Sequence, residues 1–316
     1  MNKISTFRKI AYLTALCTLF LVGLGGFVRA TGAGLACPDW PLCFGRLVPR
    51  ELQPGVFQEV FHRYVAFVVS ISTLYLMYES YRMRDIQRKV FKVMRWVVFI
   101  LLTQVVLGGL TVLLRLNPFI VTSHLILGTV FFQTLTQIGV KPSFVSQELV
   151  SPKVYGRAKL VALFVFIQIA IGGFVGSSGA SLACPDIPLC FGALIPENAS
   201  GPQFLHMTHR VFGVILLLLF IWLLKAVFES ECSPRVRRLS WALSVAMCAQ
   251  IALGFLNVYL MIPVSVTVLH LVVAQAILVG TILLARMASP STLLWEESSA
   301  EEEASQGFRK VTLSES

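Results

Sequence analysis

Residues 25–49 read GGFVRATGAGLACPDWPLCFGRLVP, and residues 172–196 read GGFVGSSGASLACPDIPLCFGALIP. The two stretches are identical at 18 of 25 positions at a constant offset of 147, which chance does not produce. Offsets of 146 or 147 relate further residues along the chain. These pairs are His62 with His209, Gln104 with Gln250, Gly108 with Gly254, and His124 with His270. A single unit is therefore present twice.

The composition places both copies of the unit in a membrane. Of the 316 residues, 56% are hydrophobic and only 13% are charged, which is too little charge to cover a soluble globule of this size. Apolar runs of roughly 20 residues, the length that crosses about 30 Å of hydrocarbon, recur along the chain. They lie at about 10–28, 60–81, 93–114, 119–139, 158–177, 207–228, 239–260 and 263–286. We therefore predict an all-α integral membrane protein of eight transmembrane helices.

The basic residues predict how these helices are oriented. Of the 26 Lys and Arg residues, 20 fall at the two termini and in the second, fourth and sixth connections with their helix edges. The other six are Arg29, Arg46, Arg50, Arg63, Arg115 and Arg210. Because loops rich in Lys and Arg stay in the cytoplasm, we predict that both termini are cytoplasmic. The formal net charge of +10 is then a topology signal, and we expect no nucleic-acid partner.

The repeat predicts how the helices are grouped. Four helices per copy is an even number, so both copies enter the membrane in the same direction and an axis along the membrane normal relates them. We predict two tandem parallel four-helix bundles, an N-terminal half at 1–145 and a C-terminal half at 146–287. Residues 288–316 have little periodicity and are predicted to be a disordered cytoplasmic tail. The glycines near the outer helix ends are expected to let helix backbones approach closely.

Two histidines in each half are candidate metal ligands. We expect His62 and His209 to begin the second and sixth helices, and His124 and His270 to lie one to two turns into the fourth and eighth. Each half then presents two imidazoles from different helices at similar depth, an arrangement that suits haem iron. Interfacial histidines bonded to a neighbouring helix are the alternative, but they would not explain matched pairs. Zinc or copper fits less well, because neither half offers a tetrahedral ligand set.

Residues beside these histidines leave alternatives open. His206 precedes His209 by three residues and shares its helix face, so it is either a rival ligand or a partner of the ligand. We favour His209, because the His-Arg pair is common to both halves. Arg63 and Arg210 follow the ligands directly. They could pair with haem propionates, since a guanidinium matches a carboxylate well, or could simply anchor the helices at the interface.

Four of the seven cysteines fall in two predicted outer loops, each with the motif Cys-Pro-Asp-x-Pro-Leu-Cys. In an oxidising compartment, Cys37 should pair with Cys43 and Cys184 with Cys190. The disulfides either clamp the loops over the pockets or take part in redox chemistry near the haem. We favour the clamp, less strongly for the first pair than for the second.

Glu59 marks the main difference between the halves. It lies three residues before His62, whereas the second half carries His206 at the equivalent position. A carboxylate beside one haem site could move protons, accept a hydrogen bond or stabilise a cationic intermediate. The alternative is charge complementarity, because an acidic residue near the start of a helix is favourable in any case. Position alone slightly favours charge complementarity.

The sequence EVFHR at 59–63, the cysteine motif before it and the paired histidines resemble the haem A synthase family over essentially all eight helices. The resemblance implies an oxidoreductase of the bacterial inner (cytoplasmic) membrane that oxidises the C8 methyl of haem O to the formyl group of haem A for terminal oxidases. Glu59 would be catalytic, His62 and His124 would bind haem O, and His209 and His270 would bind a permanent haem b. The second loop repeats the first almost unchanged, which leaves the division of labour between the cysteine pairs open.

Two other classes of protein compete with this interpretation. A bis-haem b-type electron-transfer cytochrome needs the same four histidines but does not need Glu59 on one side only. A transporter with duplicated halves would show broken helices and polar groups at mid-membrane, whereas these histidines cluster toward the outer side. The expected partners are haem O, membrane lipid and an electron donor that the sequence does not identify. Association with the enzyme that makes haem O is a hypothesis from pathway logic.

Overall fold

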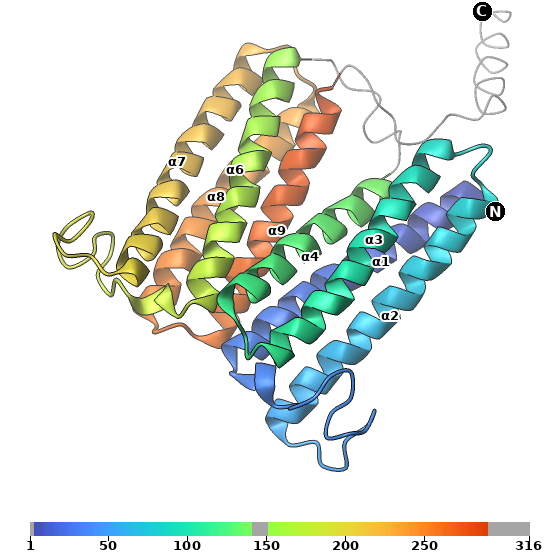
Figure 1. Ribbon diagram of the computed structural model, residues 1–316. Helices are drawn as coiled ribbons and strands as arrows, with labels where there is room; N and C mark the ends of the chain where they lie inside the picture. Colours follow the sequence, from blue (N-terminus) through green and yellow to red (C-terminus); the bar gives the residue numbers. More distant parts are fainter. Residues whose placement is uncertain (1–2, 141–150, 290–316) are drawn as a thin grey trace, which may run out of the picture.

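The computed structural model describes residues 3–140 and 151–289 (Figure 1). Within these residues, eight helices are long and apolar enough to cross a membrane, which confirms the predicted all-helical class. They are α1 (Lys3–Ala30), α2 (Pro54–Arg82), α3 (Arg88–Leu113), α4 (Pro118–Gly139), α6 (Pro152–Ser177), α7 (Gly201–Glu229), α8 (Pro234–Tyr259) and α9 (Val264–Met287). Two short 3₁₀ helices, η1 (Ala33–Leu35) and η2 (Ala180–Leu182), follow α1 and α6.

Several helices begin before the apolar runs that predicted them. Helix α2 begins at Pro54 and α7 at Gly201, six residues ahead of the predicted starts at 60 and 207. Hydropathy marks only the apolar part of a helix, whereas proline in the first turn marks its physical start, because that position needs no N–H donor. His62 and His209 therefore lie eight residues inside their helices rather than at the beginning, which corrects our expectation.

The first four helices pack around one apolar core and the last four around another. Helix α1 contacts α2 and α4, and α3 contacts the same two helices. Helix α6 likewise contacts α7 and α9, and α8 contacts those two. The largest fully buried side chains of the two cores include Leu76, Met94 and Leu135 in the first and Leu216 and Phe220 in the second. Figure 1 shows the two groups of helices side by side.

Equivalent residues of the two repeats contact each other where the first four helices pack against the last four. The contacts between the groups join α1 to α9 and α4 to both α6 and α9. There the Gln275 amide donates to the Thr129 hydroxyl at 2.9 Å, and these residues are 146 positions apart. The Arg29 guanidinium donates to the carbonyl of Gly176, which is 147 positions away. Each of these residues thus contacts its own counterpart in the other copy.

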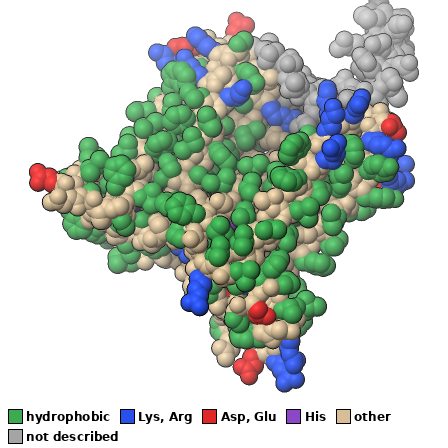
Figure 2. Space-filling model, in the orientation of Figure 1, with side chains coloured by type: hydrophobic (Ala, Val, Ile, Leu, Met, Phe, Trp, Pro, Cys, Tyr) green, Lys and Arg blue, Asp and Glu red, His purple; other side chains and the backbone are tan. Residues whose placement is uncertain are grey.

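Apolar side chains dominate the outer surface of the helices. Exposed large hydrophobic residues occur on every long helix, and most of them lie on α1, α2, α3, α7 and α8. Figure 2 shows hydrophobic side chains spread over the middle of the molecule. Lys and Arg gather at the end where the N-terminus lies, away from the cysteine loops (Figures 1 and 2). Such a surface belongs to a multi-pass membrane protein. The predicted boundary at 145/146 and residues 290–316 of the predicted tail lie outside the described residues.

Candidate functional site

A disulfide closes each cysteine loop. We call residues 31–53 the first cysteine loop and 178–200 the second. Cys37 pairs with Cys43 and Cys184 pairs with Cys190, as predicted, and all four side chains are buried. The amide of the second cysteine in each pair donates to a carbonyl three residues later, at 2.8 Å in both loops. The two loops therefore fold alike as closed, hydrogen-bonded structures at one end of the helices.

Asp39 holds the turn of the first cysteine loop. Its carboxylate accepts the amide of Gly45 at 2.8 Å and that of Phe44 at 2.7 Å. These bonds, with Gly45 the largest contribution, hold the pKa of the Asp39 carboxyl below its ordinary value, because amide donors favour the ionised form. In the second loop Asp186 accepts the amide of Gly192 at 3.0 Å. The ionised aspartate is therefore part of the loop structure.

The two arginines that follow the candidate ligands tie the helices to these loops. The Arg63 guanidinium donates to the carbonyls of Asp39 at 3.1 Å and Leu42 at 2.6 Å. Arg210 makes the equivalent bonds in the second loop. Its acceptors are the carbonyls of Cys184, Asp186 and Leu189, each at 2.7 Å. Both guanidinium groups thus bind a cysteine loop to the helix that carries a histidine. This role differs from the two alternatives considered from the sequence, which were propionate pairing and interfacial anchoring. Propionate pairing stays a prediction.

Glu59 lies inside this network. Its side chain is buried, with the residue only 4% exposed. One carboxylate oxygen forms an ion pair with Arg63 at 2.5 Å, and the other accepts the amide of Cys37 at 2.9 Å. His206, at the equivalent position, is equally buried, and no described group hydrogen-bonds its Nδ1. The carboxylate therefore connects helix α2 directly to the first disulfide, whereas in the second half the Arg210 guanidinium, which donates to the Cys184 carbonyl, makes the connection from α7.

Each of the four histidine rings packs on a glycine of the preceding helix. A Cβ atom added to Gly25 would lie 3.2 Å from Cε1 of His62, and one added to Gly172 would lie 2.8 Å from Cε1 of His209. The other two pairs are Gly108 with His124 at 3.4 Å and Gly254 with His270 at 3.3 Å. We expected these glycines to bring helix backbones together. The structure shows instead that they make room for imidazole rings.

The histidines of the second half face each other across the helices. The ring centres of His209 and His270 are 6.5 Å apart. Two axial imidazoles on one iron have ring centres about 6 Å apart, given an iron–nitrogen bond of about 2 Å and roughly 1 Å from nitrogen to ring centre. In the first half, His62 and His124 are close enough to interact electrostatically. Both pairs thus bring together the residues that the sequence predicted to share a ligand.

The polar atoms of these rings also fit a haem. Among the described residues, no group hydrogen-bonds the buried Nδ1 atoms of His62, His124, His209 and His270. A buried polar atom without a partner costs free energy, so a histidine in a membrane span needs a functional reason. No set of three or more His, Cys, Asp or Glu residues in the described ranges could hold a metal ion. Two imidazoles per half suit a haem, which brings its own equatorial ligands.

The first cysteine loop covers part of the first half. A Cβ on Gly109 of α3 would lie 2.9–3.1 Å from the indole ring of Trp40, so the loop contacts α3. The residue before Gly109 is Gly108, on which the ring of His124 packs. The equivalent residues of the second half are Ile187 and Phe255, so the packing of an indole on a glycine is particular to the first half.

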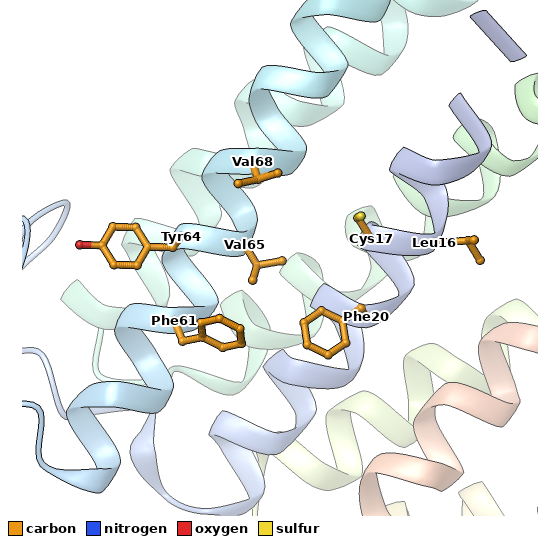
Figure 3. A pocket seen from close by; sticks show the side chains of 7 residues that line it. All are labelled: Leu16, Cys17, Phe20, Phe61, Tyr64, Val65 and Val68. Atoms are coloured by element: carbon orange, nitrogen blue, oxygen red, sulfur yellow. The ribbon is translucent and has the colours of Figure 1, made fainter. Parts of the chain in front are cut away.

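An apolar groove runs along the outside of the first half (Figure 3). Its lining comes from α1 and α2, and the rings of Phe20 and Phe61 meet across it with centres 6.4 Å apart. The lining residues are Leu16, Cys17, Phe20, Phe61, Tyr64, Val65 and Val68. Phe61 is adjacent in sequence to His62, so this hydrocarbon-compatible surface lies close to one candidate ligand.

Three glutamines next to the histidines were not recognised as site residues from the sequence. Gln104, Gln168 and Gln250 each donate a hydrogen bond to the backbone carbonyl of a histidine, at 2.9 to 3.0 Å. The repeat had related Gln104 to Gln250, but it gave them no role. The repeat does not indicate Gln168, because the equivalent residue of the first copy, 147 positions earlier, is Leu21.

Comparison with known proteins places the chain among membrane proteins of haem metabolism. Residues 8–54 and 50–282 match the family described as COX15-CtaA: Cytochrome oxidase assembly protein. The chain is 28% identical over 330 residues to the haem A synthase of Shewanella oneidensis, which covers 91% of this chain and 96% of that protein. It is 29% identical over 268 residues to the haem A synthase of Lysinibacillus sphaericus, covering 80% and 85% of the two chains.

Proposed function

The chain belongs to the COX15-CtaA family of cytochrome oxidase assembly proteins, and from that membership we propose that it is a haem A synthase. This enzyme is an oxidoreductase that converts haem O to haem A. The C8 methyl group of the substrate gains one oxygen atom and loses two hydrogen atoms, a four-electron oxidation. Successive hydroxylations give a gem-diol, which loses water to leave the formyl group.

The observation that carries this proposal is the set of two histidine pairs with a buried carboxylate beside only one of them. Relatives that bear the name haem A synthase match 91% and 80% of this chain, and the family match at 8–54 and 50–282 spans both histidine pairs. Two similar ligand pairs suit two haems, and the one-sided Glu59 gives the two sites different chemistry. An electron-transfer cytochrome would need the ligands but not this asymmetry.

We assign the substrate to the first half and the cofactor to the second. His62 and His124 would hold the iron of haem O, and His209 and His270 would hold haem b. Haem b, when bound there, supplies one-electron transfer to the substrate site. The loop cover formed by Trp40 supports this assignment, because it lies on the first half and would exclude water from the reacting substrate.

The protein's own groups supply positioning and proton transfer. The Glu59 carboxylate is buried beside the first pair and can accept or return a proton during methyl oxidation. Arg63 holds that carboxylate and the carbonyls of the first cysteine loop together. The disulfide of the loop fixes the Cys37 amide, which donates to Glu59. These contacts support the clamp interpretation of the first cysteine pair.

The finer architecture belongs to the same proposal. We infer two parallel four-helix bundles, residues 1–145 and 146–287, related by a twofold axis along the membrane normal and with both termini in the cytoplasm. Contacts between counterpart residues, such as Thr129 with Gln275, support the axis. The enzyme would lie in the inner (cytoplasmic) membrane and take haem O from the enzyme that makes it.

Extraction of haems from cells tests the function. The chain is co-expressed with a haem O synthase in a host that makes no haem A, and the extracted haems are separated by chromatography. Haem A should appear with the wild-type chain and disappear with His62→Ala, while the purified variant keeps its haem b. A red wild-type protein that yields only haems B and O would favour the electron-transfer cytochrome.

A further inference from the structure

A glutamine and a glycine one helical turn apart recur in the structure. The glycine seats a histidine ring of the next helix, and the glutamine lies four residues before it, on the same helix face. The three pairs are Gln104 with Gly108 in α3, Gln168 with Gly172 in α6, and Gln250 with Gly254 in α8. Each pair therefore contacts the next helix at two levels, the ring and the backbone of one histidine.

The glutamine contact is a hydrogen bond to the histidine backbone. The side-chain nitrogens of Gln104, Gln168 and Gln250 lie 3.0, 2.9 and 2.9 Å from the carbonyl oxygens of His124, His209 and His270, respectively. A carbonyl oxygen can only accept, so the amide group must turn its nitrogen toward it. The first lone pair of the histidine carbonyl accepts the hydrogen bond within its own helix, and the second accepts the glutamine amide. The glutamine therefore links its own helix to the next one at the histidine.

Small residues lie four positions after the histidines, next to the amides. Gly128 follows His124 by four residues, and its added Cβ would lie 3.7 Å from the Gln104 amide oxygen. Gly213 follows His209 by four residues, and its added Cβ would lie 3.7 Å from the Gln168 amide nitrogen. The corresponding residue after His270 is alanine. The contact thus has matched features on both helices.

The fourth histidine lacks this bond. Gly25 seats the ring of His62, but the residue four positions before Gly25 is Leu21, which has no donor. Among the described residues, no side chain hydrogen-bonds the carbonyl of His62. The small residue after the histidine is still present as Ala66. The small residue after the histidine is therefore retained while the amide donor is absent.

We propose that Gln104, Gln168 and Gln250 are positioning residues that fix the depth and rotation of the haem-ligating histidines, and that Leu21 leaves His62 as the ligand that can withdraw. This inference rests on the proposed function, in which one haem must stay and the other must enter and leave. Both histidines of the second half carry the amide bond, as a permanent haem requires. The first half has one fixed ligand, His124, and one movable ligand, so that the product can leave.

Haem release from the purified holoprotein tests this inference. Excess apomyoglobin captures the haems, release is followed optically, and the captured haems are identified by chromatography. We expect a fast phase and a slow phase, and His62→Ala should remove the fast one. Gln168→Met, which keeps the size of the side chain but has no donor, should accelerate the slow phase. Leu21→Gln, which restores the missing donor, should slow the fast phase.

The expected changes follow from the strength of such bonds. Hydrogen bonds between membrane helices correspond to roughly threefold to twentyfold in an equilibrium constant. The Gln168→Met variant should also shift the low-spin electron paramagnetic resonance signal of the second haem, because that signal reports the orientation of the axial imidazoles. A packing role alone would not give Leu21→Gln a slower release. The inference is overturned if both phases keep their wild-type rates in Gln168→Met and Leu21→Gln.

The two proposals fail in different ways. Absence of haem A in cells that make haem O would reject the synthase function. Both sites would then hold haem B, and the two release phases would still show whether the glutamines fix their ligands. A normal yield of haem A with unchanged release rates in both variants would reject the positioning role alone.

Discussion

Glu59 and His206 occupy the same place in the two copies of the unit, yet their surroundings differ. The carboxylate of Glu59 contacts both an arginine and a loop amide. The imidazole Nδ1 of His206 has no hydrogen-bond partner among the described residues. At the scale of single residues, the difference at this position gives different surroundings to two sites whose ligands and ligand-packing glycines are alike.

We predict that Glu59→Gln lowers haem A formation by roughly a hundredfold, because the amide cannot exchange a proton as a carboxylate does. The amide oxygen can still accept the Cys37 amide, so the loop should remain closed. The ratio of haem A to haem O in cell extracts measures the effect. His206→Gln is the matched control in the second half and should leave this ratio within about threefold. Equal losses in both variants would contradict a catalytic role for Glu59.

Gly172, on which the ring of His209 packs, gives a second prediction. Gly172→Ala places a Cβ 2.8 Å from the ring and should displace it, so the purified protein should lose the haem of the second half. Gly176→Ala, one turn later on the same helix, meets nothing within 4 Å and should keep both haems. The haem content per protein, read from the Soret absorbance, measures both variants. Full haem content in Gly172→Ala would show that His209 is not a ligand.

At the scale of elements, hydrogen bonds fix each cysteine loop to the helix that follows it. Arg63 and Arg210 each reach from a helix to several carbonyls of a loop, so the loop and the histidine below it are held by the same element. The first loop adds the Trp40 contact with α3 and the bond from Cys37 to Glu59. A change in the first loop should therefore be felt at the first haem site and much less at the second.

Acid should loosen the first cysteine loop. Its Asp39 carboxyl has a pKa below the ordinary 3.8, so its stabilising effect is present above that value and is lost as the pH falls through the lowered pKa. At pH 6 the Cys37–Cys43 disulfide should then be reduced by a water-soluble phosphine more slowly in the wild type than in Asp39→Ala, and the two rates should converge as the pH falls below 3.8. Comparing the two proteins at each pH cancels the effect of acid on the phosphine itself. A constant ratio of the two rates at both pH values would exclude Asp39 as the cause.

Sequence and structure agree best on the helices and least on the contacts between them. Eight spans follow from apolar runs, because a membrane segment must be apolar over a fixed length. The depth of His62 was misjudged because Pro54–Phe61 is helical but not strongly apolar. The hydrogen bond that the Cys37 amide donates to Glu59 joins residues 22 apart through a folded loop, which no local pattern encodes.

At the scale of the whole molecule, the contact between Thr129 and Gln275 is the clearest mark of the repeat. We predict that Gln275→Thr destabilises the protein by about 1 kcal/mol, since two threonine hydroxyls are too short to bridge the gap. Exchanging both residues, with Thr129→Gln and Gln275→Thr together, should recover most of the loss. Thermal unfolding in detergent measures both. A double variant as unstable as the sum of its single changes would argue against a twofold axis at this contact.

A contact between equivalent residues of the two repeats is also the kind of contact found at the centre of a symmetric homodimer. Two separate copies of a half-length chain, facing each other as a homodimer, would have brought this one position together from both sides, and any mutation there would have appeared twice. In one polypeptide the two copies are free of that constraint. Threonine could remain on one side while glutamine stood on the other, and the same freedom allowed one haem pocket to specialise without altering its twin.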